Sequence, residues 1–222
     1  MKLITAFLFL IFFCAIQSHA QTYTPRTGDL LFQDMDCGPL CDAIEKVTEG
    51  VGGMDFSHIG LIHVTDNGVA MVIEALGSGV QLTPLDVFNS RSRDATGKPK
   101  VIVAHMPDSL ADVSHQAVSI ALKQLGMPYD NTFLPNNNKW YCSELIAFAF
   151  NKAAGRTLFP DAPMTFKDPA GGMFLPVWTE YYQELQIRIP EGVKGCNPGG
   201  MSRAPFLQFE MPYSDFGGAY KP

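Results

Sequence analysis

The chain has 222 residues, of which 46% are hydrophobic, 17% charged and 11% aromatic. This balance is typical of a globular protein and excludes an intrinsically disordered chain, a coiled coil and a collagen-like repeat. The formal net charge of -6 and the scarcity of basic runs argue against nucleic acid or an anionic membrane as a partner. We therefore expect one globular domain, with at most an appendage.

The N-terminus has the pattern of a secretory signal peptide. Lys2 gives a short positive region, residues 3–16 are almost wholly apolar, and the Ser-His-Ala at 18–20 forms a small-x-small cleavage site. The apolar run is shorter than the ~20 residues of a membrane-spanning helix, and no later stretch is long enough to span a bilayer. We expect residues 1–20 to be removed, leaving an exported chain of residues 21–222 that is periplasmic or secreted.

Strands and helices alternate through the first two thirds of the chain. Residues 56–64 and 69–75 are rich in β-branched and aromatic side chains and flank the turn sequence Asp66-Asn67-Gly68, which predicts a β-hairpin. Pro39 suits the first turn of a helix, and Gly155 suits the C-terminal cap of another. The full set of predicted elements is a turn followed by a short strand within 27–32, a helix over 39–49, the hairpin, a short helix over 83–88, a strand over 100–105, and helices over 108–125 (inner face Val113, Ala117, Ile120 and Leu125) and 142–154.

Beyond Phe159 the composition shifts to Pro, Gly and aromatic residues, and one short helix is predicted over 177–185. We interpret residues 159–222 as an irregular extension wrapped over a core of about 28–154, so that residues 21–222 form a single domain. The order of strand, helix, hairpin, strand, helix and helix predicts an α+β fold with a small antiparallel sheet.

Four cysteines follow the cleavage site, and export to an oxidising compartment favours disulfides. They are Cys37, Cys41, Cys142 and Cys196. Four cysteines allow three fully paired connectivities, and a bond between Cys37 and Cys41 would leave the other two as free thiols. A chain of this length and apolar content does not need disulfides in order to fold.

Cys142 stands at the start of the predicted 142–154 helix, directly after a polar loop. A helix N-terminus presents unpaired amides and a partial positive charge, which stabilise a thiolate. The same amides can bind the oxyanion of a tetrahedral intermediate. The alternative is a buried structural cysteine or one half of a disulfide, and position alone leaves the two interpretations equally open.

A thiolate nucleophile needs an imidazole partner. His58 stands at the entrance of its predicted strand beside a Gly-rich loop, and the rim of a rigid element is a usual place for an active-site base. His63 lies an odd number of residues further along and so faces the opposite side of a regular strand. His105 ends a strand, and His115 lies among polar neighbours on a helix. The pattern favours His58, with a structural or solvated histidine as the alternative.

Glu74 follows an apolar run on the strand after His58. A carboxylate flanked by Ile73 and Ala75 is not expected to be buried without a partner. Placed across the hairpin from His58, it can accept the imidazole N–H and fix the tautomer, as the third member of a catalytic triad does. The alternative is a glutamate on an edge strand that faces solvent.

Metal and cofactor chemistry finds little support. The cysteines and histidines form no CxxC pair and no HxxxH on a helix, and the spacing of Cys37 and Cys41 has no matching partners, so no metal is predicted. The glycine pairs at 171–172 and 199–200 are interpreted as turns. No phosphate-binding loop follows a strand, so no cofactor is predicted.

Five short motifs occur in order along the chain, and with the signal peptide they resemble the circularly permuted branch of the NlpC-type papain-fold cysteine hydrolases, the YiiX/YebB-like group. The resemblance runs from about Gly28 to Ala154. The motifs are Thr27-Gly28-Asp29-Leu30-Leu31-Phe32, Phe56-Ser57-His58-Ile59-Gly60-Leu61, Ile73-Glu74-Ala75, Gly126-x-Pro128-Tyr129-Asp130 and Tyr141-Cys142-Ser143-Glu144-Leu145.

This resemblance implies a permuted papain-like fold, in which a small antiparallel sheet carries the histidine and a helix carries the cysteine at its N-terminus. His58 precedes Cys142, which is the order of the permuted branch and the reverse of the order in most papain-like enzymes. By resemblance, Cys142 is the nucleophile, His58 the general base and Glu74 the residue that orients it. Tyr141 would lie near the oxyanion and Asp29 at the pocket edge.

The implied activity is that of an exported cysteine hydrolase that cleaves an amide bond through an acyl-enzyme. Cell-wall peptides and other peptides are the first candidate substrates. A lipid-linked N-acyl amide, or an acyltransferase reaction on such a compound, is the alternative: a long apolar cleft favours lipid and a polar groove favours peptide. A catalytically silent envelope-binding module and a disulfide-stapled structural protein are the non-enzymatic alternatives.

The first cysteine pair lies in a segment that can approach the active site. We hypothesise that Cys37, Cys41 or both form a disulfide and leave Cys142 free. A bridge between Cys142 and Cys196 would contradict both this hypothesis and the hydrolase interpretation.

Overall fold

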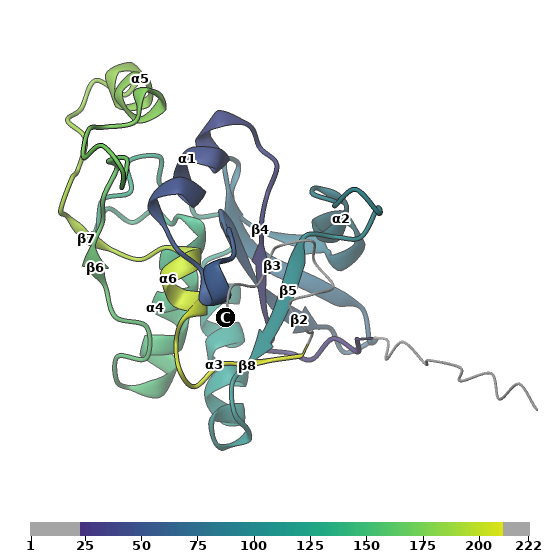
Figure 1. Ribbon diagram of the computed structural model, residues 1–222. Helices are drawn as coiled ribbons and strands as arrows, with labels where there is room; N and C mark the ends of the chain where they lie inside the picture. The colour runs from purple at the N-terminus through teal and green to yellow at the C-terminus, as the bar shows by residue number, and fades with distance from the viewer. Residues whose placement is uncertain (1–22, 211–222) are drawn as a thin grey trace, which may run out of the picture.

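The computed structural model of the chain describes residues 23–210, and the predicted signal peptide at residues 1–20 lies outside that range. Helices and strands alternate as far as α4, and short elements follow it (Figure 1). In chain order they are β1 (Leu30–Gln33), α1 (Pro39–Val47), the 3-10 turn η1 (Val51–Gly53), β2 (His58–Val64), β3 (Ala70–Leu76), β4 (Gly79–Pro84), α2 (Leu85–Ser90), β5 (Val101–His105), the 3-10 turn η2 (Asp108–Leu110), α3 (Ala111–Leu122), α4 (Cys142–Ala154), β6 (Ala162–Pro163), α5 (Pro176–Glu184), β7 (Lys194–Gly195), α6 (Pro198–Ser202) and β8 (Gln208–Phe209).

The main sheet has six strands in the order β4-β3-β2-β1-β5-β8. Every neighbouring pair in it is antiparallel. The hairpin of β2 and β3 pairs Leu61 with Ile73 and Val64 with Ala70, around the predicted turn. The predicted α+β fold with an antiparallel sheet is therefore confirmed, and it places the strand of His58 near the middle of the sheet.

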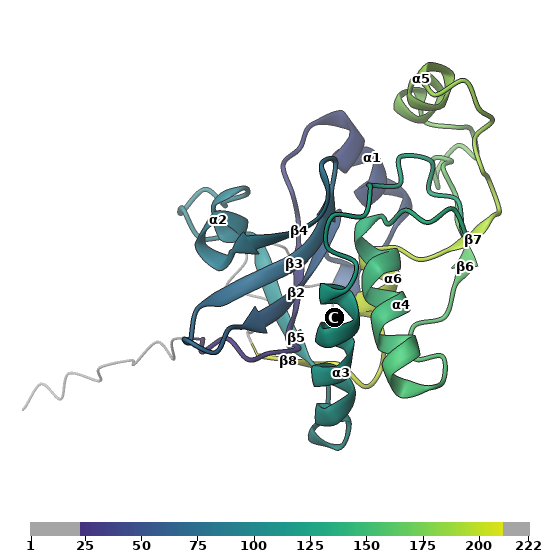
Figure 2. The same ribbon diagram turned by 180° about the vertical axis from the view of Figure 1, so that it is seen from behind.

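Helices α3 and α4 lie side by side over one face of the sheet (Figure 2). The main apolar cluster fills the space between these helices and the inward-facing side chains of the strands, such as Leu30, Ile59 and Leu61. A smaller cluster covers the opposite face, where Phe88 of α2 packs on Ile62 and its neighbours. The sheet is thus buried on both faces near the strands that carry the predicted histidine and glutamate.

The chain between α3 and α4 departs from the prediction. The helix predicted over 108–125 is a 3-10 turn followed by α3, which ends at Leu122, and Leu125 is 40% exposed rather than on the inner face. The reason is that residues 126 and 127 pair with β4: the Gly126 amide donates to the Val80 carbonyl and the Val80 amide to the Met127 carbonyl, both at 2.9 Å.

Strand β4 was not predicted, because the Thr-Pro at 83–84 was interpreted as the start of a helix. The strand pairs residue by residue with β3, so that Gln81 lies opposite Glu74. Pro84 ends the strand, and α2 begins one residue later at Leu85. This extra strand gives β3 a neighbour on each side, so β3 is not an edge strand.

The segment after α4 is more regular than predicted. The expected helix is present as α5, and the segment also contains β6, β7, α6 and β8, of which β8 pairs with β5 at the end of the main sheet. Helix α5 lies next to α1, far from the sheet (Figure 1). Among residues 23–210, no helix has the length and apolar character needed to cross a membrane.

Candidate active site

Cys142 is the first residue of α4, as predicted, and is a free thiol with 7% exposure. The backbone amides of the first turn have no partner within the helix and face the region of the thiol. The side chain of Glu144, in the first turn of α4, accepts a hydrogen bond from the backbone amide of Tyr141, the residue before the helix. The helix start therefore combines a buried sulfur with the positive end of a helix dipole.

His58 is the first residue of β2 and is 2% exposed. Its Nε2 lies 2.7 Å from Oε2 of Glu74, and the ring also hydrogen-bonds with Cys142. Since an ionised carboxylate only accepts, Nε2 carries the proton and Nδ1 is the nitrogen left for the thiol. Burial disfavours the imidazolium, but the bonds to Cys142 and Glu74 outweigh it and raise the pKa of His58 to about 9.

Glu74 is fully buried in the middle of the sheet, which excludes the alternative of a solvent-facing glutamate. Burial alone would favour the neutral acid. Hydrogen bonds from His58 and Arg91 outweigh the burial and lower the pKa of Glu74 to about 2. Thr83 of β4 also donates to Oε1. The carboxylate is therefore ionised at neutral pH and fixes the tautomer of the imidazole.

Arg91 is a functional candidate that the sequence reasoning missed. Its two terminal nitrogens each lie 2.6 Å from one carboxylate oxygen of Glu74, in a bidentate pair. Its guanidinium also lies 5.5 Å from the ring of Phe88, which in turn lies 5.7 Å from the ring of His58. One signal in the sequence could have indicated this role. Glu74 lies between apolar residues and needs a cationic partner, and Arg91 is close to it in the sequence.

Gly60 of β2 leaves space on the sheet for the ring of Phe88. A Cβ at this position would lie 2.3 Å from Cγ1 of Val72 and 3.1 Å from the ring of Phe88. The absence of a side chain at Gly60 therefore lets Phe88 pack directly on β2, beside the His58 ring.

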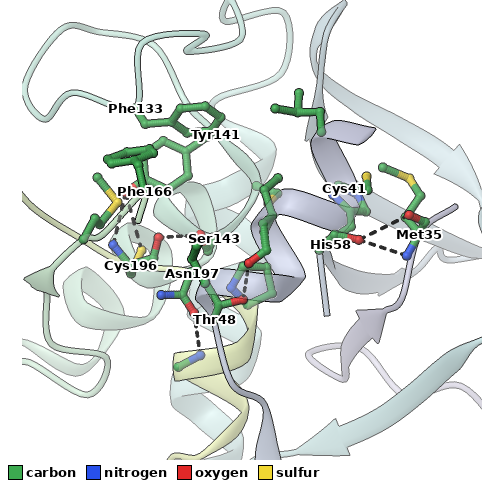
Figure 3. A pocket seen from close by; sticks show the side chains of 18 of the residues that line it. Met35, Cys41, Thr48, His58, Phe133, Tyr141, Ser143, Phe166, Cys196 and Asn197 are labelled. Atoms are coloured by element: carbon green, nitrogen blue, oxygen red, sulfur yellow. Dashed lines mark hydrogen bonds between the residues drawn. The ribbon is translucent and has the colours of Figure 1, made fainter. Parts of the chain in front are cut away.

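A cavity of about 470 Å³ surrounds the thiol and the imidazole (Figure 3). Among the described residues that line it, Glu49 and Arg203 are the only charged ones besides the His58–Cys142 pair, and they pair with each other at 3.4 Å on exposed side chains. Apolar and aromatic side chains from α1, α5 and the loops form most of the remaining wall. They include Met35, Leu40, Ile44, Val47, Phe133, Met164, Phe166 and Trp178.

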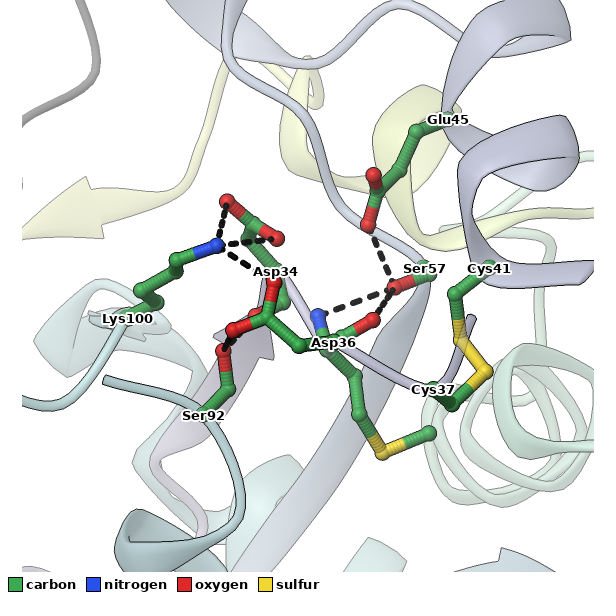
Figure 4. Close-up of a disulfide and its surroundings, with 9 residues drawn as sticks. Asp34, Asp36, Cys37, Cys41, Glu45, Ser57, Ser92 and Lys100 are labelled. Carbon is green, nitrogen blue, oxygen red and sulfur yellow. Dashed lines mark hydrogen bonds and ion pairs between the residues drawn. A yellow bond between two sulfur atoms is a disulfide. The ribbon is translucent and has the colours of Figure 1, made fainter. Parts of the chain in front are cut away.

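Helix α1 forms one wall of this cavity and is tied to the strand of the histidine (Figure 4). A disulfide joins Cys37 to Cys41 across the start of the helix, which confirms the hypothesis that this pair leaves Cys142 free. Further along α1, the Ser57 hydroxyl donates to the Glu45 carboxylate at 2.6 Å. Because Ser57 directly precedes His58, this bond links the cavity wall to the catalytic strand.

Tyr141 and Tyr129 both line the cavity, but their hydroxyls differ. The Tyr141 hydroxyl accepts the backbone N–H of Cys196 at 3.2 Å, so it fixes the Cys196 segment rather than standing free for an oxyanion. Tyr129 has no hydrogen-bond partner for its hydroxyl among the described residues. Burial and the charge of Cys142 raise the pKa of Tyr129, so it stays a protonated donor beside the thiol. Tyr129 belongs to the motif at 126–130, for which no catalytic role was predicted.

Asp29 lies away from the cavity instead of at its edge. It is 2% exposed and accepts hydrogen bonds from the Tyr23 hydroxyl at 2.6 Å and the Arg26 amide at 2.9 Å, so it organises the entry to β1. Within residues 23–210, no three His, Cys, Asp or Glu side chains are grouped so that they could hold a metal ion.

A central antiparallel strand that supplies an imidazole, followed later in the chain by a helix that begins with a thiol, defines a papain-like cysteine hydrolase in permuted order. The chain belongs to the family described as permuted papain-like amidase enzyme, YaeF/YiiX, C92 family, whose pattern matches residues 24–209. This is a family of cysteine peptidases and amidases.

Two proteins to which the chain is similar come from Escherichia coli. The chain is 31% identical to the uncharacterized protein YiiX of strain K12 over 137 residues, which are 61% of this chain and 62% of that protein. The crystal structure of YiiX from strain O157:H7, which is described as a metalloprotein, matches with a TM-score of 0.70 and 25% identity. That match covers 85% of this chain and 98% of the other.

Proposed function

We propose that this protein is an exported cysteine amidase that uses Cys142 as nucleophile, His58 as acid and base, and Glu74 to orient His58. The observation that carries the proposal is the hydrogen-bonded series from Cys142 through His58 to Glu74, buried at one end of a cavity. A raised imidazole pKa beside a thiol supports a thiolate–imidazolium pair at neutral pH.

The reaction follows from this geometry. The Cys142 thiolate attacks the amide carbonyl, and the oxyanion lies near the amides at the start of α4 and the Tyr129 hydroxyl. His58 transfers its Nδ1 proton to the leaving nitrogen as the C–N bond breaks, which leaves an acyl-enzyme. His58 then takes a proton from water, which attacks the thioester and releases the acid.

The first candidate substrate is a peptide, including the peptides of a cell wall, because an exported enzyme meets them there. The second is a lipid-linked N-acyl amide, with hydrolysis or transfer of the acyl group as the outcome. The lining of the cavity favours the second candidate, since most of its wall is apolar and its charged side chains Glu49 and Arg203 already pair with each other rather than with the charges of a cell-wall peptide.

A metal has no part in this mechanism. A structural relative is described as a metalloprotein, but in this chain the Glu74 carboxylate is taken up by Arg91, Thr83 and His58, and no third ligand within residues 23–210 joins Cys142 and His58. The donor set therefore does not fit a metal centre.

The test is the pH profile of Cys142 alkylation by iodoacetamide, read at each cysteine by peptide mass spectrometry. We expect fast labelling of Cys142 near pH 6, slowed by His58→Ala and unchanged by His115→Ala, a matched control on the exposed face of α3. Cys196 serves as an internal reference, because burial raises its pKa to about 12. Labelling of Cys142 at the rate of an ordinary thiol, whatever residue stands at position 58, would favour a catalytically silent binding module.

A further inference from the structure

The loop that leads into α5 carries an exposed apolar tip, which we define as residues 169–177. None of these residues has a charged, hydroxyl or amide side chain. Met173 is 75% exposed, the largest fraction for any large apolar side chain within residues 23–210, and Phe174 is 39% exposed. Residues 169–172 are exposed as well. The tip therefore presents a continuous apolar stretch to the surroundings, which a protein surface in water rarely does without a partner.

The backbone of the apolar tip is hydrogen-bonded within the loop. The Asp168 amide donates to the Met173 carbonyl and the Gly172 amide donates to the Asp168 carbonyl, both at 2.8 Å. The Ala170 amide donates to the Asp168 carboxylate at 3.0 Å. Because these amides already have partners, moving the tip out of water does not leave them unpaired, which would be the main cost of such a transfer.

The apolar tip adjoins the catalytic cavity. Phe166 precedes it and Trp178 follows it, and both side chains line that cavity, with their rings 5.0 Å apart. The Leu175 amide donates to the Phe166 carbonyl at 3.2 Å, which fixes the base of the loop. The tip is thus held in a defined place beside the cavity, next to α5 and far from the main sheet (Figure 1).

Two lysines lie at the base of the apolar tip. The ammonium group of Lys167 lies 5.3 Å from the centre of the Phe174 ring and 3.7 Å from the Glu191 carboxylate. Lys46 of α1 pairs with Asp168 at 3.2 Å. Both lysine side chains are exposed, and exposed ion pairs contribute little, so these ammonium groups are free to turn to phosphates. Apolar side chains with lysines beside them are typical of an element that lies in a lipid surface, with the lysines at the headgroups.

The size of the apolar tip decides between a lipid surface and a protein as its partner. A stable protein interface buries about 1,200–2,000 Å² and takes about 20–30 residues from each side. The tip offers a single short loop, which is too small for a second copy of this chain or for another protein. A fluid lipid surface needs only a few inserted side chains. Since the net charge of -6 disfavours an anionic surface, the surface that fits is zwitterionic, with phosphates for the two lysines.

We infer that the apolar tip binds this protein weakly and reversibly to a zwitterionic lipid surface, with Met173 and Phe174 inserted and the catalytic cavity held beside that surface. The inference goes beyond the proposed function and stands without it, because neither Cys142 nor His58 takes part in the binding. It also gives a lipid-linked substrate a short path from the surface to the cavity.

The experiment measures cosedimentation of the protein with sucrose-loaded phosphatidylcholine vesicles over a range of lipid concentrations. A single myristoyl chain binds vesicles with an association constant of about 10⁴ M⁻¹, and the tip inserts less apolar surface, so we expect half-binding at about 1 mM lipid. Met173→Gln combined with Phe174→Gln should weaken binding about 20-fold, because two inserted apolar side chains are lost. Cys142→Ala should bind as the original protein does.

A matched control replaces two exposed apolar residues elsewhere on the surface. Val69→Gln combined with Leu125→Gln removes similar side chains outside the tip and should leave binding unchanged. Thermal unfolding followed by circular dichroism verifies that each variant is folded at the temperature of the assay.

Three outcomes would overturn the inference. The first is no binding at a lipid concentration about tenfold above the expected midpoint. The second is equal binding by the tip variant and the control variant. The third is a dimer in sedimentation velocity that the tip variant abolishes, without binding to vesicles, which would assign the tip to a second copy of the chain. None of these outcomes alters the alkylation profile of Cys142, so a failure here is distinct from a failure of the proposed function.

Discussion

The two sides of the catalytic cavity differ in chemical character, because one carries a charged network and the other is mostly apolar. On the sheet side, His58, Glu74 and Arg91 form a charged network in which Glu74 is fully buried and every hydrogen-bonding atom of the carboxylate is used. On the helix side, the thiol of Cys142 stands among aromatic and aliphatic groups of the loops and α5. The difference indicates that the sheet sets protonation states, while the loops and the segment after α4 choose the substrate.

The largest expected effect comes from breaking the charged side at its centre. Glu74→Gln keeps the shape but removes the charge that orients His58 and neutralises Arg91. We expect kcat/KM to fall by about 10³–10⁴, as when a triad carboxylate is replaced by its amide. Leaving Arg91 without its partner should also lower the free energy of unfolding by about 3–5 kcal/mol. Ester hydrolysis and denaturant unfolding measure the two effects.

A matched control for this change is Glu180→Gln, on the exposed surface of α5. It should leave both kcat/KM and stability unchanged. A Glu74→Gln enzyme with activity within tenfold of the original would mean that the carboxylate does not orient His58, and the catalytic role of the sheet side would have to be reassigned.

On the other side of the cavity, Tyr129→Phe removes a hydroxyl that has no internal partner among the described residues. If it donates to the oxyanion, kcat should fall by about 10² with little change in KM, the loss typical of one oxyanion donor. Tyr181→Phe is the control, because Tyr181 also lines the cavity but its hydroxyl donates to the Asn131 carbonyl at 2.8 Å. Equal effects of the two variants would assign Tyr129 to packing only.

Arg91→Gln tests the charged side of the cavity more gently, because it removes the cation that pairs with Glu74 but keeps the Glu74 carboxylate. Arg91 lowers the pKa of Glu74, so its loss raises that pKa, and the acidic limb of kcat/KM should move to higher pH. We expect a loss of roughly tenfold at pH 7, from weaker orientation of His58, and partial rescue by added guanidinium. Arg93→Gln, whose arginine donates to the Gly97 carbonyl on the surface, is the control.

A purely structural role for Arg91 would give a different pattern. Activity would then fall in proportion to the folded fraction, with the pH profile unmoved and no rescue by guanidinium. The pH profile therefore separates positioning from folding.

The same contrast explains what the sequence could predict. Local signals placed the β2–β3 hairpin through its Asp66–Gly68 turn and placed Cys142 at a helix start, and the structure has both elements. The meeting of His58 and Glu74 followed from strand pairing in that hairpin. These features depend on neighbours in the chain, where turn and capping chemistry is decisive.

The features that the sequence did not predict depend on contacts between segments that are distant in the chain. Strand β4 was hidden because Pro84 is a helix-start signal locally, whereas pairing with β3 decides the outcome. Arg91 belongs to no motif, and it has a role only because the fold places it beside Glu74. Asp29 was assigned to the pocket by resemblance alone, and its hydrogen bonds with Tyr23 and Arg26 place it elsewhere.

The smallest expected effect concerns the bond between α1 and the catalytic strand. Burial raises the pKa of Glu45 to about 7, opposed by the hydrogen bond from Ser57. Because the folded carboxyl holds its proton more tightly than the unfolded one, stability should fall as pH rises from 4.5 through about 7. Glu45→Gln cannot ionise, so its Tm should exceed that of the original protein by a few degrees at pH 8.5 and equal it at pH 4, in contrast to Glu180→Gln. A Tm difference that is the same at both pH values would mean that ionisation of Glu45 does not strain the junction, and that α1 holds its wall of the cavity equally well across this range.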